Sequence, residues 1–269
     1  NKATGESGAA VTLRRQVAGG FGYFTNIPAH IDGVSAKTLR LVMRSKNTKL
    51  IFNDFNSNFT EFKQNLKYVV NGSVPAATET GVKFSDGSDA YVLYSIDLTK
   101  WFPHGDIDKN GFLGYEDYQA DHTAWTRPDN IHAGMLKGSV FASNFIIPFA
   151  YKDGKNTMEL QLLAEDGHII KVWNVTIPDA NSNADLGLTD ESASVFNVVR
   201  NHMYNLGVKT DQNTKPEPGK PDPNPDPTPD PDPDKPKHGT DEPEDLSKGQ
   251  NLVLKVNDNW ETIHQLGIE

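Results

Sequence analysis

The sequence predicts a mostly β protein with the architecture of a β-sandwich. Short runs rich in β-branched and aromatic residues recur along the chain, and such residues are enriched in strands. Glycine, asparagine and aspartate turn signals separate these runs. No repeat with a period of about 20–50 residues is evident. Many short strands joined by turns are therefore expected to pack as two sheets around one core.

The composition excludes several classes of function. The chain has 269 residues, a formal net charge of −10 and a pI near 5.3. Nucleic acid is not expected as a partner, because phosphate binding needs a basic face. The absence of cysteine excludes disulfides, thiolate zinc sites and a cysteine nucleophile. The sequence has no run of about eighteen apolar residues, so no membrane span is expected. No nucleophile elbow, phosphate-binding glycine loop, H-E-x-x-H motif or obvious Ser/His/Asp arrangement is present, so we expect no enzyme. The abundant carboxylates leave a glycosidase pair open, which would need a cleft with converging carboxylates.

The folded body is expected to span residues 10–210, after a polar arm at residues 1–9. Residues 38–44 alternate apolar and polar side chains, which predicts a half-buried strand. Asp166-Gly167 separates two alternating runs and predicts a tight hairpin. Asn58 caps a short helical pattern, and a division into two lobes near residues 100–135 is left open. Strands are expected at residues 11–17, 21–27, 38–44, 49–52, 67–70, 91–98, 139–150, 157–164, 168–177 and 194–208.

A proline-rich linker at residues 211–249 separates this body from the end of the chain. It holds eleven of the seventeen prolines, together with eleven acidic residues and five lysines, and so carries −6 of the net charge of −10. Alternating proline favours an extended polyproline II conformation, and the acidic residues repel one another. The linker is expected to act as a spacer.

The C-terminal segment, residues 250–269, contains a short amphipathic strand. Leu252, Leu254 and Val256 lie on one side of it and Lys255 on the other. Trp260 follows as an anchor. A single strand has unpaired backbone groups. It is expected either to return to its own body or to complete the sheet of another chain.

A calcium-loop pattern lies in the expected insertion between two strands. Residues 106–117 read D-I-D-K-N-G-F-L-G-Y-E-D, which matches the D-x-D-x-N-G spacing of a twelve-residue loop. The predicted Ca²⁺ ligands are the side chains of Asp106, Asp108, Asn110 and Asp117 and the carbonyl of Phe112. Aspartate at the twelfth position departs from the usual glutamate, although dockerin-like calcium loops also have it. The expected role is to staple a long loop.

Three stretches together resemble one family. Residues 14–19 (R-R-Q-V-A-G) with residues 23–28 (Y-F-T-N-I-P) resemble an early strand of the Bacteroidales fimbrillin superfamily. Residues 196–207 contain its late R-N-x-x-Y motif, and residues 256–260 (V-N-D-N-W) are similar to its C-terminal V-x-V-x-P-W ending. Asn259 stands where the family often has proline.

The resemblance implies a fimbrial protein of the FimA and Mfa type on the cell surface or outer membrane, made as a lipoprotein precursor. The early motif favours the FimB-like anchor or tip branch. A transthyretin-like, Greek-key sandwich would then be expected. Proteolysis, here at Arg14 or Arg15, would precede polymerisation, in which the C-terminal strand of one subunit fills the groove of the next. The partners would be other fimbrial subunits, and a host or bacterial surface glycan or protein.

The alternative function is a calcium-stapled β-sandwich module that binds carbohydrate. It predicts exposed aromatic side chains near the calcium loop, drawn from Trp101, Tyr115, Tyr118 and Trp125. The C-terminal strand would then simply return to its parent sheet.

Overall fold

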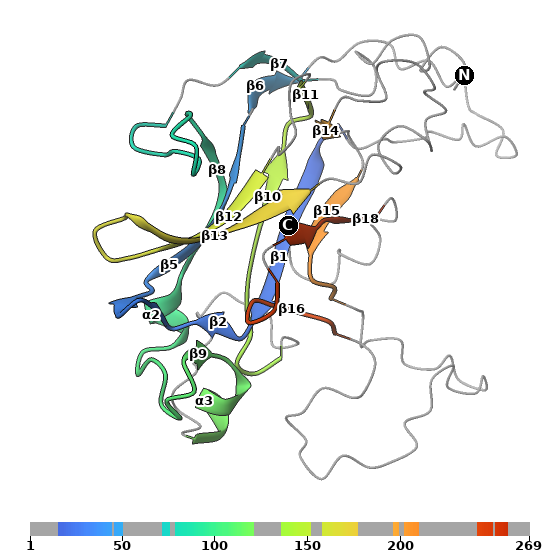
Figure 1. Ribbon diagram of the computed structural model, residues 1–269. Helices are drawn as coiled ribbons and strands as arrows, with labels where there is room; N and C mark the ends of the chain where they lie inside the picture. Colours follow the sequence, from blue (N-terminus) through green and yellow to red (C-terminus); the bar gives the residue numbers. More distant parts are fainter. Residues whose placement is uncertain are drawn as a thin grey trace, which may run out of the picture.

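The chain forms a β-rich fold of two main sheets in the computed structural model (Figure 1). No helix in the part of the chain described below is long and apolar enough to cross a membrane. The structure describes residues 16–44, 46–50, 72–75, 79–120, 136–151, 158–176, 196–198, 202–209, 241–249 and 251–257.

Each main sheet has five strands. The first sheet has the order β10 (Val140–Ile146), β1 (Ala18–Thr25), β15 (Met203–Leu206), β18 (Lys255–Asn257), with β16 (Glu244–Asp245) also paired to β1. The second sheet has the order β17 (Asn251–Val253), β13 (Ile169–Thr176), β12 (Met158–Leu163), β5 (Thr38–Met43), β8 (Tyr91–Asp97).

Small elements decorate the two sheets. The two-stranded pairs are β2 (Ile27–Pro28) with β9 (Phe112–Leu113), β3 (His30–Ile31) with β4 (Val34–Ser35), β6 (Asn47–Leu50) with β7 (Gly72–Pro75), and β11 (Phe149–Tyr151) with β14 (Phe196–Val198). The helices are α2 (Leu98–Trp101) and α3 (Tyr115–Ala120).

The core lies between the two main sheets. β12 is buried on both faces. Leu160 and Leu162 belong to the main core, while Gln161 points to the other face, where its amide donates to the Lys83 carbonyl at 2.8 Å. The largest fully buried side chains include Trp173, Tyr23, Tyr204, Phe24, Phe84 and Ile27. The mostly β sandwich that the sequence predicts is therefore consistent with the structure.

Glycine in β1 allows the second sheet to approach closely. A Cβ atom at Gly22 would collide with the Tyr94 hydroxyl of β8, and one at Gly20 would collide with Leu93. Tyr94 is buried, and its hydroxyl has no hydrogen-bond partner among the described residues. Burial raises the pKa of this phenol well above its ordinary value. Gly20 and Gly22 of β1 therefore set the distance between the sheets.

The insertion that holds the acidic loop connects the two sheets. It leaves the second sheet after β8 and enters the first sheet at β10. The amide of Asn144 in β10 also donates to the Leu93 carbonyl in β8 at 2.9 Å. The two edge strands β8 and β10 therefore form one seam of the sandwich.

The body resumes at Asp241, inside the range that composition assigns to the linker. Val208 and Glu242 exchange two backbone hydrogen bonds, of 2.7 and 2.8 Å. The Lys209 ammonium and the Asp241 carboxylate form an ion pair at 2.9 Å, and their side chains are 8% and 0% exposed. Leu246 is fully buried. Lys209 and Asp241, which flank segment 210–240 in the sequence, therefore lie side by side.

Local signals predict the strands of the second sheet well. The strands expected at residues 38–44 and 91–98 and the hairpin around Asp166-Gly167 appear as β5, β8 and β12–β13. The single strand expected at residues 139–150 forms two, β10 and β11. The expected helix after Asn58, the expected strand at residues 67–70 and the N-terminal arm lie outside the described residues.

Candidate functional site

The acidic loop, residues 106–117, is held against the start of the fold by backbone pairing. β9, in the middle of the loop, pairs antiparallel with β2, and Ile27 lies opposite Leu113. The Ala29 N–H donates to the Gly111 carbonyl at 3.0 Å. A Cβ atom at Gly114 would collide with the Asn26 side chain. The loop is therefore packed against the β1–β2 corner.

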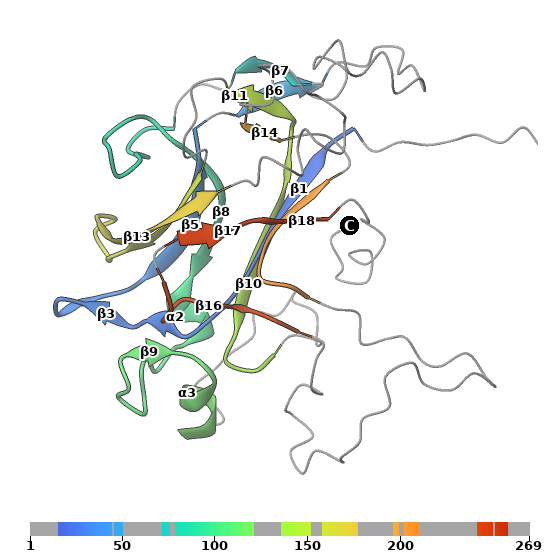
Figure 2. The ribbon, with the colours of Figure 1, turned by 45° about the vertical axis from the view of Figure 1, so that its right-hand side comes forward.

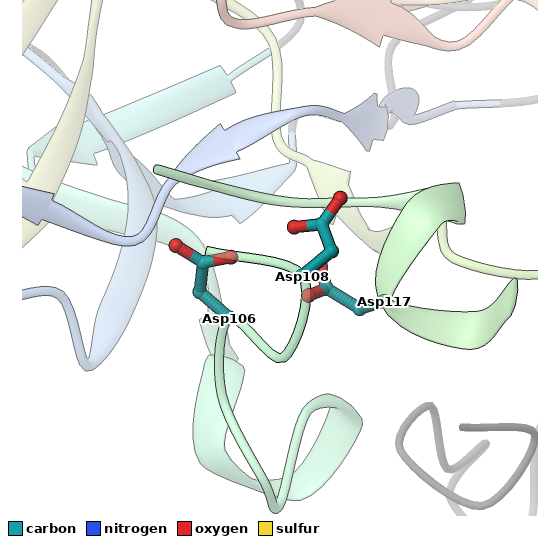
Figure 3. A group of neighbouring side chains, drawn as sticks. All are labelled: Asp106, Asp108 and Asp117. Atoms are coloured by element: carbon teal, nitrogen blue, oxygen red, sulfur yellow. The ribbon is translucent and has the colours of Figure 1, made fainter. Parts of the chain in front are cut away.

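Three carboxylates of this loop converge. One oxygen atom from each of Asp106, Asp108 and Asp117 lies within 4.8 Å of the other two (Figure 3). These are the three carboxylates that the loop pattern places at positions one, three and twelve. The acidic triad could hold a metal ion, because carboxylate oxygens at this separation suit hard divalent cations.

Hydrogen bonds inside the loop explain why the residue types recur at this spacing. Asp106 Oδ2 accepts from the Gly111 N–H at 2.8 Å. Asp108 Oδ1 accepts from the Asn110 N–H at 3.0 Å. Asn110 Oδ1 in turn accepts from the Phe112 N–H at 2.8 Å. Gly111 takes the sharp turn with φ at +91°, a conformation that glycine adopts without steric cost.

The Phe112 carbonyl is expected to face away from β2. Along an antiparallel ladder, alternate residues point their backbone polar groups to opposite sides. Gly111 faces β2 through its carbonyl, whereas the Phe112 N–H turns to Asn110. The N–H and C=O of one extended residue point the same way, so the Phe112 carbonyl faces away from β2. This direction suits its predicted place among the oxygen donors.

The electrostatics of the triad are unfavourable without a cation. Asp117 is fully buried, and its two oxygens accept from the Ile107 and Gly114 N–H groups at 2.8 Å each. Burial raises the pKa of Asp117, and Asp108 and Asp106 raise it further by charge repulsion, against the lowering effect of the two N–H bonds. Asp106 Oδ1 is buried and has no hydrogen-bond partner within the part of the chain that the structure describes. A bound cation would offset the repulsion and satisfy this oxygen.

The C-terminal strand residues lie in the chain's own core. Leu252 and Leu254 are 2% and 1% exposed. β17 pairs parallel with β13, with Leu252 opposite Val175, and the Leu254 N–H donates to the Thr176 carbonyl at 3.0 Å. β18 then pairs antiparallel with β15 of the first sheet. Figure 2 shows this crossing, with β17 beside β13.

For four of the predicted site residues, the structure describes no side-chain position. The backbone of Val256 pairs with Tyr204. The Val256 side chain, Trp260, Arg14 and Arg15 lie outside what the structure describes.

Sequence reasoning missed the buried ion pair of Lys209 and Asp241, because Asp241 stands in an acidic, proline-containing stretch whose composition is typical of a linker. The signal that marks this stretch as folded is the lone apolar residue Leu246.

The prediction of exposed aromatic residues beside the loop is wrong for two of them. Trp101 and Tyr118 are 4% and 5% exposed. Trp101 packs edge-on against Phe141, and Tyr118 accepts a hydrogen bond from Lys137 at 2.7 Å. Tyr115 is half-buried, and Trp125 lies outside the described residues. The Trp101 and Tyr118 rings are therefore part of the buried face of their helices.

Comparison with protein-family models, curated proteins and solved structures finds no match for this chain.

Alternate residues of the C-terminal strand should differ sharply in their effect on stability. We expect Leu254→Ala to lower the free energy of unfolding by about 2–5 kcal/mol, because it leaves a cavity in the core. Val253→Ala is the matched control, since Val253 is 58% exposed, and it should change stability by less than about 0.5 kcal/mol. Urea unfolding measures both, and equal effects of the two substitutions would contradict the placement of the strand.

Proposed function

We propose that this protein is a structural or adhesive subunit of a bacterial surface fimbria that assembles by β-strand addition. The observation that supports this most is the C-terminal strand, which pairs with β13 of the second sheet and with β15 of the first. Leu252 and Leu254 supply its buried side chains, and backbone pairing with β13 and β15 supplies its hydrogen bonds. A strand addition uses the same two components, a backbone ladder and side-chain pockets.

The chain before this strand is longer than closure of the fold requires. About thirty residues separate Lys209 from Asp241, yet the two residues form an ion pair. An extended polyproline II segment of that length would span roughly 90 Å at about 3.1 Å per residue. A segment of that length would let the strand reach a neighbouring subunit and would also let it close on its own body.

Mass action decides between these two arrangements. A strand joined covalently to its own body meets its own acceptor strands at an effective concentration on the order of millimolar. The isolated chain therefore closes on itself, and exchange needs neighbours held close together or an acceptor groove that has been opened. Proteolysis at Arg14 or Arg15, just before β1, is the step that we propose opens it. Export to the cell surface belongs to the same proposal.

The family assignment and the finer topology are part of the proposal. They are supported by the motifs at residues 14–28, 196–207 and 256–260, which resemble the Bacteroidales fimbrillin superfamily and its transthyretin-like sandwich. β1 and β15, which carry two of these motifs, are parallel neighbours in the first sheet, with Gly20 opposite Tyr204.

We further propose that the acidic triad binds Ca²⁺. The donors are all oxygen atoms, which suits a hard cation, and the loop supplies the alternating spacing of a calcium loop. The ion would staple the insertion between β8 and β10. It would thereby fix the seam at which these two strands meet.

A second candidate function, a carbohydrate-binding module stapled by calcium, is favoured by one observation. Asp106 lines a surface pocket as well as the acidic loop.

Removal of residues 250–269 tests the assembly proposal. We expect the truncated chain to give no polymer on the surface of cells that make it, because the donor strand is missing. Electron microscopy of whole cells and gel analysis of polymer ladders measure this. The full-length Val253→Ala variant is the control and should assemble normally. Unchanged assembly of the truncated chain would show that the strand is not the donor.

Calcium should stabilise the protein through the triad. At a free Ca²⁺ concentration about 100 times the dissociation constant, we expect a gain of about 2.7 kcal/mol in the free energy of unfolding. Asp117→Asn should abolish this gain, because it removes a charge from the buried ligand. Glu116→Gln is the matched control. It removes the same charge from the adjacent, exposed residue, and this variant should keep the stabilisation by Ca²⁺. Calorimetric titration with Ca²⁺ and thermal melts measure both. An identical calcium response of the two variants would refute the site.

A further inference from the structure

A pocket of about 430 Å³ lies beside the acidic loop and plays no part in strand addition. Three segments form it: the stretch from Ala29 to Lys37, helix α2 with the residues that follow it, and the start of the acidic loop. Asp106, one of the three carboxylates labelled in Figure 3, is the triad member that lines the pocket. The volume is within the range of about 300–1,000 Å³ typical of small-molecule sites.

The pocket has an apolar floor and a polar rim. Its floor consists of the buried side chains Ala36, Leu98, Phe102 and Leu113. Its rim carries the polar side chains His30, Ser35, Lys37, Thr99 and Asp106. An apolar surface ringed by a few polar groups is the usual form of a small-ligand site, because the floor supplies contact area and the rim fixes orientation.

Several rim groups are not committed to protein partners. The Lys37 ammonium lies 3.8 Å from Glu165, whose side chain is 86% exposed, and an exposed pair at that distance contributes little. Within the described residues, neither the His30 ring nor the Ser35 hydroxyl hydrogen-bonds to a protein group. Donors and acceptors therefore remain available around the opening.

The charges of the rim select the class of ligand. Lys37 would repel a cationic ligand and Asp106 would repel an anionic one. A hydroxyl group both donates and accepts, so a neutral polyhydroxylated ligand can bond to Lys37, Asp106 and Ser35 together. The C–H face of a sugar ring would lie on the apolar floor. We propose that this pocket binds a saccharide unit of one or two sugar rings.

The pocket and the calcium loop share one residue. Because Asp106 belongs to both, occupation of the loop by Ca²⁺ fixes the carboxylate that the saccharide contacts. This coupling rests on the proposed calcium site, whereas the rest of the pocket does not. The pocket is also independent of the C-terminal strand, since no residue of that strand lines it.

The test uses the full-length, calcium-loaded chain and a panel of free neutral mono- and disaccharides. Saturation-transfer NMR should detect at least one binder, and calorimetric titration should give its affinity. We expect Lys37→Gln to weaken this affinity about tenfold, because it removes a charged donor, and Ser35→Ala to weaken it less. Lys100→Gln is the control, since Lys100 is 73% exposed and does not line the pocket. EDTA should weaken binding of the saccharide.

Two results would overturn the proposal. One is the absence of any binder in protein whose melting temperature rises normally with Ca²⁺, which would reject the pocket and leave the calcium site standing. The other is a binder whose affinity is the same for the wild type and for Lys37→Gln and Ser35→Ala. Thermal melts of each variant show that it is folded, so a loss of binding reports on the pocket itself.

Discussion

The fold depends on the closure of two seams between its sheets. Each main sheet has two edges, and a sandwich with open edges leaves both backbone groups and core side chains uncovered. At one seam β8 and β10 meet, joined by the insertion that carries the acidic loop. At the other, the chain passes from β17 to β18 through Leu254, which is buried and hydrogen-bonded to Thr176. The core is complete only when both crossings are in place.

The two crossings are held by different physical means, and this difference separates the two proposed roles. The insertion is held by short-range contacts, in which the buried Asp117 carboxylate accepts hydrogen bonds from two backbone N–H groups. Asp106 and Asp108 repel this carboxylate, and a cation would relieve the repulsion. The C-terminal crossing is held by a few backbone pairs and by two buried leucines. A crossing of the second kind can be supplied by another chain without a change in the groove, and it is the one that we propose is exchanged.

Local patterns predicted the second sheet and the acidic loop. Strands β5 and β8 follow from alternation, the β12–β13 hairpin from Asp166-Gly167, and the converging carboxylates from the spacing of one loop. Long-range pairing had no such signal. The alternation of side chains cannot show that β1 runs parallel to β15. Leu246 is buried, but it stands in an acidic stretch whose composition is typical of a linker. The burial of Trp101 and Tyr118 was missed because the sequence of an insertion does not show whether an aromatic side chain is exposed or lies in the core.

A disulfide lock on the C-terminal strand tests the central claim most directly. Asn174 in β13 and Asn251 in β17 are register partners, and the chain has no cysteine of its own. Asn174→Cys with Asn251→Cys should, when oxidised, hold the strand in its own groove. The account predicts that the oxidised double variant stays monomeric while folded and calcium-responsive, and that a reductant restores polymerisation, with each single variant as a control. Equal polymerisation of the oxidised and reduced forms would contradict strand exchange.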